Sequence, residues 1–136
     1  MIVAHPDHPM FAGLPPSIRE VVRYPVAMTT LEPRYINILR SQFDVDLEKL
    51  PGRVICSDYD VLAKITMDAP HFFTAGPRFA FAGEIASGHL RVLQTNVPVK
   101  HLVSMHTNTG AYPLPAVREV QEVVRQTCAE FKATSP

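Results

Sequence analysis

The stretch RVICSDYDVLAKITMDAP, from Arg53 to Pro70, decides the fold class of this chain. Its opening residues Arg53–Ser57 are mostly apolar and include β-branched side chains, which predicts a short buried strand. Asp58 then precedes a segment in which apolar residues recur at helical spacing, so a helix is expected to follow directly. The expected buried face of that helix consists of Val61, Leu62 and Ile65.

The same alternation of strand and helix continues on both sides of this stretch. Further strands are predicted at residues 2–4, 25–30, 71–74, 89–95 and 101–107. Helices are predicted at residues 17–24, 33–43 and 76–88, and from Leu114 to about Ala133. Gly88 fits the position just past a helix end. Strands that alternate with helices predict an α/β fold, with a mainly parallel sheet flanked by helices.

Length and composition indicate one globular domain without a nucleic-acid-binding surface of its own. The 136 residues are 46% hydrophobic and 19% charged, enough for a real core and too apolar for a disordered chain. The 13 basic residues are balanced by 13 acidic ones, so the net charge is zero. A duplex-DNA binder needs a basic surface. We therefore expect that this chain alone does not bind DNA.

Cysteine usage and the N-terminal sequence indicate a cytoplasmic protein. Cys56 and Cys128 fall in a predicted strand and a predicted helix, so buried reduced thiols are favoured over a disulfide. No apolar run reaches about 18 residues, the length that a membrane-spanning helix requires. The first residues, MIVAHPDHPMF, also lack the basic and then apolar pattern of a secretory signal.

The order of these elements resembles the effector domain of LysR-type transcriptional regulators. The resemblance is carried by MIVAHPDHPMFAG (1–13), SIREVVRYPVAM (17–28), RVICSDYDVLAKITMDAPHFF (53–73), EIASGHLRVL (84–93) and HLVSMHTNTGAYPLPAVREVQEVVRQ (101–126). Each piece is only weakly specific, whereas the ordered series is more so. The family joins a winged helix-turn-helix and a linker helix to a two-lobed effector domain, which resembles a periplasmic binding protein.

The resemblance implies a partial effector domain over residues 1–136. Residues from about 10 to 94 would be the second lobe, while residues 1–9 and 95–136 would supply hinge strands and the C-terminal helix of the first lobe. The implied function is sensing of a small-molecule effector, without a cofactor, to control transcription through the parent protein. DNA contact would come only from a helix-turn-helix domain that is absent from this chain.

The expected effector site lies at the ends of two strands. Ser57 matches the Ser or Thr that contacts effectors at this strand end in the family, and Thr30 follows the preceding strand. Ligands bind beyond the carboxyl ends of strands in open α/β sheets. We therefore expect Ser57 and Thr30 to face one cleft, with Thr29 turned away by strand alternation. The full set of predicted effector-binding residues is Ser57, Thr30, Asp58, Thr29, Phe73 and His8.

The charges near this site bear on the class of effector. Free backbone N–H groups at a helix start favour an anion. Asp58 and Glu32 already place carboxylates at such starts, so a neutral or singly charged molecule is favoured. An N-cap role is also sufficient to explain Asp58.

Two other classes of function remain open at this stage. One is a small α/β hydrolase-like enzyme that uses Ser57 or a His/Asp set, and the other is a structural fragment that binds nothing. Ser57 lies outside a Gly-x-Ser-x-Gly motif, and Cys56 lies in an apolar strand, so no enzyme activity is expected. The segment HPDHP (5–9) carries two prolines that spread its side chains, whereas a metal needs three or four convergent ligands, so no metal site is expected.

The final helix gives a reason for self-association. The stripe made by Val117, Val120, Val124 and Phe131 would pack on first-lobe elements that this chain lacks, so a homodimer that covers it is expected. Residues 2–4 and 101–106 would be strand edges without their usual neighbours, which also favours pairing between copies.

Overall fold

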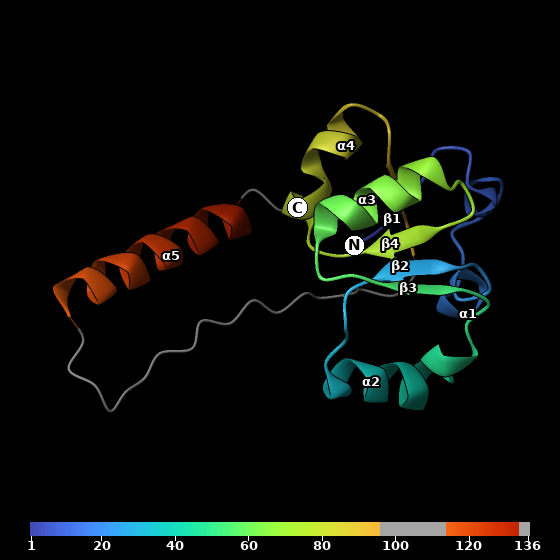
Figure 1. Ribbon diagram of the computed structural model, residues 1–136, viewed down its shortest axis with the longest axis horizontal. Coiled ribbons are helices and arrows are strands. Elements are labelled where there is room, and N and C mark those ends of the chain that lie inside the picture. The colour runs from blue at the N-terminus through green and yellow to red at the C-terminus, as the bar shows by residue number, and fades with distance from the viewer. Residues whose placement is uncertain (96–113, 134–136) are drawn as a thin grey trace. The chain divides into compact units, whose positions relative to one another are not determined.

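The computed structural model describes residues 1–95 and 114–133 (Figure 1). The chain divides into two compact units between Leu102 and Val103, and each unit is considered by itself. The second unit contributes the helix α5 (Pro115–Ala133), close to the predicted bounds. The first unit contains the sheet and all other elements.

The first unit is built on one five-stranded sheet in the order β3-β2-β4-β1-β5. The strands are β1 (Ile2–Ala4), β2 (Val26–Met28), β3 (Arg53–Ile55), β4 (Phe73–Ala75) and β5 (Arg91–Leu93). β2 runs parallel to β3 and β4, whereas β1 runs antiparallel to β4 and β5. The expected α/β class is confirmed, and β1 is the one strand that runs against the others.

The position of β1 corrects one expectation from the sequence. Residues 2–4 were expected to form an edge, yet β1 lies between β4 and β5 and pairs with both. All three residues of β1 are buried. Two neighbouring strands already satisfy its backbone groups, so β1 offers no edge to a second copy. The other predicted edge, residues 101–106, lies outside the described residues.

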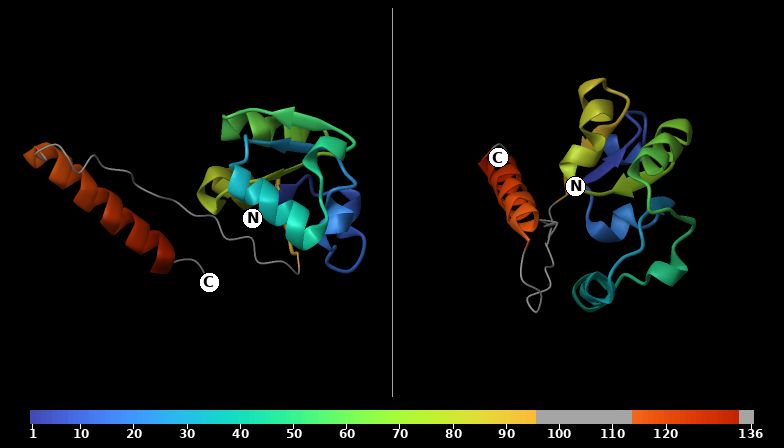
Figure 2. Two further views of the ribbon diagram at one scale, coloured as in Figure 1. Left: turned by 90° about the horizontal axis from the view of Figure 1, so that it is seen from below. Right: turned by 60° about the vertical axis from the view of Figure 1, so that its left-hand side comes forward.

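Short helices cover both faces of this sheet. The α-helices of the first unit are α1 (Ile18–Val21), α2 (Pro33–Phe43), α3 (Tyr59–Asp68) and α4 (Ala82–Ala86). The 3-10 helices are η1 (Pro9–Phe11), η2 (Leu47–Lys49) and η3 (Arg78–Phe81). Figure 2 (left) shows α2 in front of the strands and α3 behind them.

Two hydrophobic clusters lie on the two faces of the sheet. Residues from η1 and α1 pack on the face that carries Ile2, Val26 and Phe73. Residues from α3 and η3 pack on the opposite face, around Val3 and Phe81. The alternation of side chains along β1, with Ile2 and Val3 in different clusters, follows the two-residue period of a strand.

Several helix ends follow directly from the sequence. Pro33 is the first residue of α2, where its missing N–H costs nothing. The same helix ends at Asp44, which adopts a left-handed conformation (φ 56°), one that Asp tolerates better than most residues. Gly88, with φ 78°, follows the end of α4, as expected.

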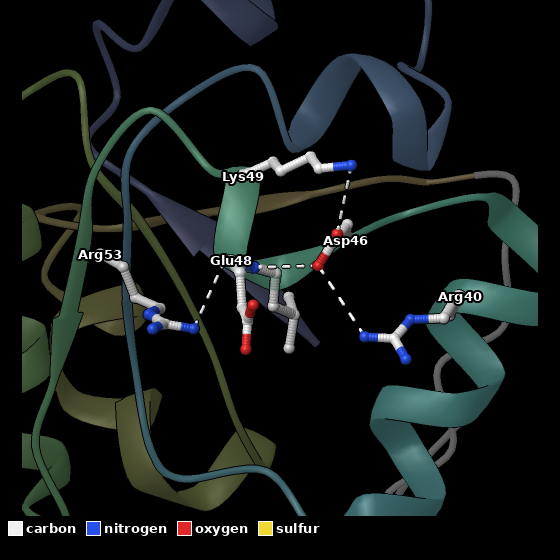
Figure 3. A network of polar contacts seen from close by, with 6 residues as sticks. Arg40, Asp46, Glu48, Lys49 and Arg53 are labelled. Carbon is white, nitrogen blue, oxygen red and sulfur yellow. Dashed lines mark hydrogen bonds and ion pairs between the residues drawn. The ribbon is translucent and has the colours of Figure 1, made fainter.

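The connection from α2 to β3 is held by polar contacts (Figure 3). Asp46 accepts a hydrogen bond from the Glu48 N–H at 3.2 Å and lies 3.5 Å from Lys49 Nζ and 3.9 Å from Arg40 Nη2. The backbone hydrogen bond and these two cations hold the pKa of Asp46 below its usual value. Arg53, at the start of β3, donates to a carbonyl of η2. These contacts position the strand whose other end carries Ser57.

The buried face of α3 differs from the expected one. Leu62, Ala63 and Thr66 are the buried residues, whereas Val61 is 44% exposed. Because Ala63 and Thr66 are small, the helix can approach the sheet closely through this face. The prediction that Val61 belongs to the buried face is therefore wrong.

One polar atom in this core has no partner. Within the described residues, Thr74 Oγ1 is buried and makes no hydrogen bond, although Thr74 lies at the centre of β4. Thr66, which is also fully buried, donates its hydroxyl to the Leu62 carbonyl at 2.8 Å. Both threonines are therefore fully buried, but only the Thr66 hydroxyl has a hydrogen-bond partner within the described residues.

Replacing Thr74 by Val is expected to raise the free energy of unfolding by about 1–2 kcal/mol, because burying an unpaired hydroxyl is costly. Urea denaturation measures the change. The matched control is Thr66→Val, which removes a made hydrogen bond and should lower stability by about 0.5–1.5 kcal/mol. Equal losses for both variants would contradict the prediction.

Candidate functional site

Three strands end at one edge of the sheet. Met28 pairs with Ile55 in the parallel register of β2 and β3, and Ala27 pairs with Thr74 of β4. The chain therefore leaves β2, β3 and β4 at the same edge, which is the edge where ligands bind in open α/β sheets. We call this edge, with the residues that directly follow each strand, the strand-end edge.

The predicted hydroxyl residues lie at the strand-end edge. Thr29 and Thr30 follow β2, and Ser57 follows Cys56 after β3. Thr30 and Ser57 are exposed, whereas Thr29 is half-buried. Among the described residues, no hydrogen-bond partner occupies the hydroxyls of Thr30 and Ser57. Both are therefore available to an external ligand, and their facing one cleft stays a prediction.

Asp58 is the N-cap of α3. Its Oδ1 accepts hydrogen bonds from the Asp60 N–H at 2.8 Å and from the Val61 N–H at 3.4 Å. The N-cap interpretation of Asp58 is confirmed. Two of the first free amides of the helix are thus occupied by the chain's own carboxylate, and Asp60 adds a second carboxylate to the first turn.

Tyr59 and Gly76 also lie at this edge, and sequence reasoning missed both. The Tyr59 ring meets the Phe81 ring edge to face, with centroids 5.8 Å apart. A Cβ at Gly76, directly after β4, would stand 2.7 Å from Tyr59 Cε1 and 3.0 Å from Phe81 Cε2. Gly76 is also tied to Met1 by hydrogen bonds through its N–H and its carbonyl. The dipeptide Gly76-Pro77 was the available signal of a close approach.

The structure places Phe73 and His8 away from the strand-end edge. Phe73 is the first residue of β4, pairs with Val26 at the start of β2, and is 5% exposed. His8 precedes η1 and is 1% exposed. The fold therefore brings Thr29, Thr30, Ser57 and Asp58 to one edge and leaves these two residues in the core.

The histidine-rich loop does not gather metal ligands. Asp7 donates its backbone N–H to His5 Nδ1, and the Asp7 carboxylate lies 3.7 Å from the same nitrogen. Within residues 1–95 and 114–133, no group of three or more His, Cys, Asp or Glu side chains could hold a metal ion. His101 and His106 lie outside the described residues.

Both cysteines have free thiols, but they are not buried as expected. Cys56 is half-buried, and its Sγ accepts a hydrogen bond from the Asp58 N–H at 3.5 Å. Cys128 is exposed on α5. The expectation of a buried thiol is therefore wrong for Cys128.

Comparison with known proteins gives one family. Residues 1–129 match the family described as "LysR substrate binding domain", which covers nearly the whole chain. No curated protein matches the sequence. In the part of the chain that the structure describes, no helix combines the length and the apolar composition that crossing a membrane requires.

Proposed function

The chain belongs to the LysR substrate-binding-domain family, and we propose that it senses a small-molecule effector for a transcriptional regulator of this type. The observation that carries the proposal is the strand-end edge. There the exposed hydroxyls of Thr30 and Ser57 follow adjacent parallel strands and have no partner within the described residues. Hydroxyl groups at such ends can donate to and accept from a polar ligand.

The same proposal assigns the parts of the chain to two lobes. Residues from about 10 to 94 act as the second lobe, and residues 1–9 and 95–136 as hinge strands and C-terminal helix of the first. An effector that binds one arrangement of the lobes better shifts their population toward it. The regulator transmits that shift to DNA through a helix-turn-helix domain outside residues 1–136, in the cytoplasm.

The geometry favours a neutral or cationic effector group at α3 over a carboxylate. Asp58 already accepts from two amides of the helix start, and Asp60 lies beside it. Glu32, the N-cap residue of α2, is exposed and makes no side-chain cap hydrogen bond. These carboxylates would stay in place when an anion binds, and they would repel it.

A panel of amines, amides and carboxylates with matched carbon skeletons tests this function. Backbone amide NMR shifts should change saturably at Thr29, Thr30 and residues 56–60, and carboxylates should bind about two- to fivefold more weakly than the matched amides. Ser57→Ala should weaken binding by about two- to tenfold, the value of one hydrogen bond. Ser41→Ala, an exposed serine on α2, is the matched control and should change nothing. Saturable NMR shift changes at residues outside the strand-end edge, unaffected by Ser57→Ala, would contradict the proposal.

We further propose that a second copy of the chain covers the apolar stripe of α5. Val117 and Val120 are 42% and 62% exposed. Burying such side chains contributes about 1.5–3 kcal/mol each. Sedimentation equilibrium at micromolar concentration should show a species of twice the 15.1 kDa chain mass, and Val120→Glu should abolish it.

Ala129→Glu is the matched control for this association. Ala129 is exposed and lies two and a half turns after Val120, on the opposite side of α5 from the stripe, so its replacement should leave the dimer intact. A single 15.1 kDa species of the unmodified chain at every concentration would show that the stripe needs no second copy.

A further inference from the structure

His8 joins three separate segments of the first unit. Its Nε2 lies 3.1 Å from the His71 carbonyl oxygen, in the segment before β4. Its Nδ1 accepts the Met10 N–H at 3.1 Å and so caps η1. Its ring meets Tyr24, just before β2, with centroids 4.7 Å apart and planes at 66°. The ring is 1% exposed, so water cannot substitute for these partners.

These partners fix the protonation state of the ring. A backbone N–H can only donate and a carbonyl can only accept, so Nδ1 must be bare and Nε2 must carry the hydrogen. A second proton on Nδ1 would point at the Met10 N–H and place two donors against each other. The cap of η1 would be lost, and a charge would be created where the side chain is buried.

The groups around the ring reinforce this preference. Burial lowers the pKa of His8 below its ordinary value, and positive charge on His71 and His5 lowers it further, while the hydrogen bond to the His71 carbonyl opposes the shift. Two charged groups nearby have contacts of their own. Asp7 lies beside His5, and Arg91 stacks over the Phe11 ring of η1 at 4.5 Å.

We propose that His8 is an acid-sensitive latch: its neutral ring holds the segment from Asp7 to Phe11 against the starts of β2 and β4, and protonation of Nδ1 releases that segment. The sign follows from proton linkage. The folded state binds the proton less readily than the unfolded state, whose His titrates near 6.5. The stability from the latch is complete above about pH 6.5 and is lost as the pH falls toward the lower folded value.

Urea denaturation between pH 7.5 and 5.0 tests the latch on the full chain. In the unmodified protein, the unfolding equilibrium constant should rise about tenfold for each unit by which the pH falls below about 6.5, until the pH reaches the folded-state pKa of His8. This is the slope for uptake of one proton on unfolding. His8→Asn can still cap the Met10 N–H through its side-chain oxygen but cannot titrate. This variant should be less stable at pH 7.5 and should lack that acid-dependent rise. The control His71→Asn keeps the backbone carbonyl and should retain the rise.

A long-range ¹H–¹⁵N NMR titration of the unmodified protein gives a second readout. It should show His8 protonated only on Nε2 at pH 7.5, with the Met10 amide losing protection from exchange as His8 titrates below pH 6.5. Three outcomes would overturn the latch: a proton on Nδ1 at pH 7.5, titration of His8 at 6.5 or above, or full acid dependence in His8→Asn. The NMR result decides the question even if that variant does not fold.

Discussion

Replacing Phe81 by Ala is expected to lower the free energy of unfolding by about 3–5 kcal/mol, among the largest losses for a single substitution in this chain. Phe81 is 0% exposed and is the largest fully buried side chain of the described residues. It packs in one cluster with Val3, Ala63 and Leu90, from a strand, a helix and a loop. These segments cannot all move inward to fill the space left by the ring. Urea denaturation at pH 7.5 gives the value directly.

Phe79→Ala is the matched control for this substitution. Phe79 lies two residues earlier in the same 3-10 helix but is 58% exposed, so its removal should change stability by no more than about 0.5 kcal/mol. A loss below about 1.5 kcal/mol for Phe81→Ala would mean that the site collapses around the cavity. The substitution should also disturb the strand-end edge, because the Tyr59 ring packs edge to face against the Phe81 ring.

The elements that local chemistry determines were predictable from the sequence. α2 begins at Pro33 and ends at Phe43, as its apolar spacing and first-turn proline predict. Asp58 caps α3, because a short carboxylate before an apolar helix satisfies the amides that the helix leaves free. Thr30 and Ser57 follow parallel strands, so their position at one edge follows once an α/β fold with a parallel sheet is predicted.

The features that depend on distant partners were not predictable in this way. β1 has three residues, and its pairing of Ile2 with Ala75 spans most of the first unit, so nothing near residue 2 indicates a central position. The orientation of α3 was missed because Thr66 looks polar in the sequence, yet its hydroxyl returns to the Leu62 carbonyl and allows burial. Local patterns carry no information on either point.

The surroundings of His8 were not predictable from local patterns either. The dipeptide His8-Pro9 resembles a family motif, and the resemblance alone does not say which neighbours the ring meets. The fold brings the His71 carbonyl and Tyr24 to it from two other segments. Both ring nitrogens then have partners within the chain.

Replacing Gly76 by Ala is expected to lower the free energy of unfolding by about 1–3 kcal/mol, the usual cost of overpacking, and to disturb the strand-end edge. The added Cβ would stand 2.7 Å from Tyr59 Cε1 and 3.0 Å from Phe81 Cε2, closer than carbon atoms approach. Phe81 is fully buried, and the Gly76 backbone is held by two hydrogen bonds to Met1, so the Tyr59 ring must move. That movement shifts the start of α3 beside Ser57, so effector binding should weaken as well.

Gly83→Ala and a double-mutant cycle separate this steric effect from a general glycine effect. Gly83 lies in α4 with no heavy atom within 4 Å of an added Cβ, so its replacement should be neutral or stabilise by up to about 1 kcal/mol. Combining Gly76→Ala with Tyr59→Ala removes the nearer obstacle. The double variant should then lose less free energy of unfolding than the sum of the two single losses, by about 0.5–3 kcal/mol. Strict additivity would mean that the Tyr59 ring does not limit the space at Gly76. A sub-additive result would instead show that Tyr59 and Gly76 are energetically coupled at the strand-end edge. This edge also carries the Ser57 hydroxyl that we propose contacts the effector.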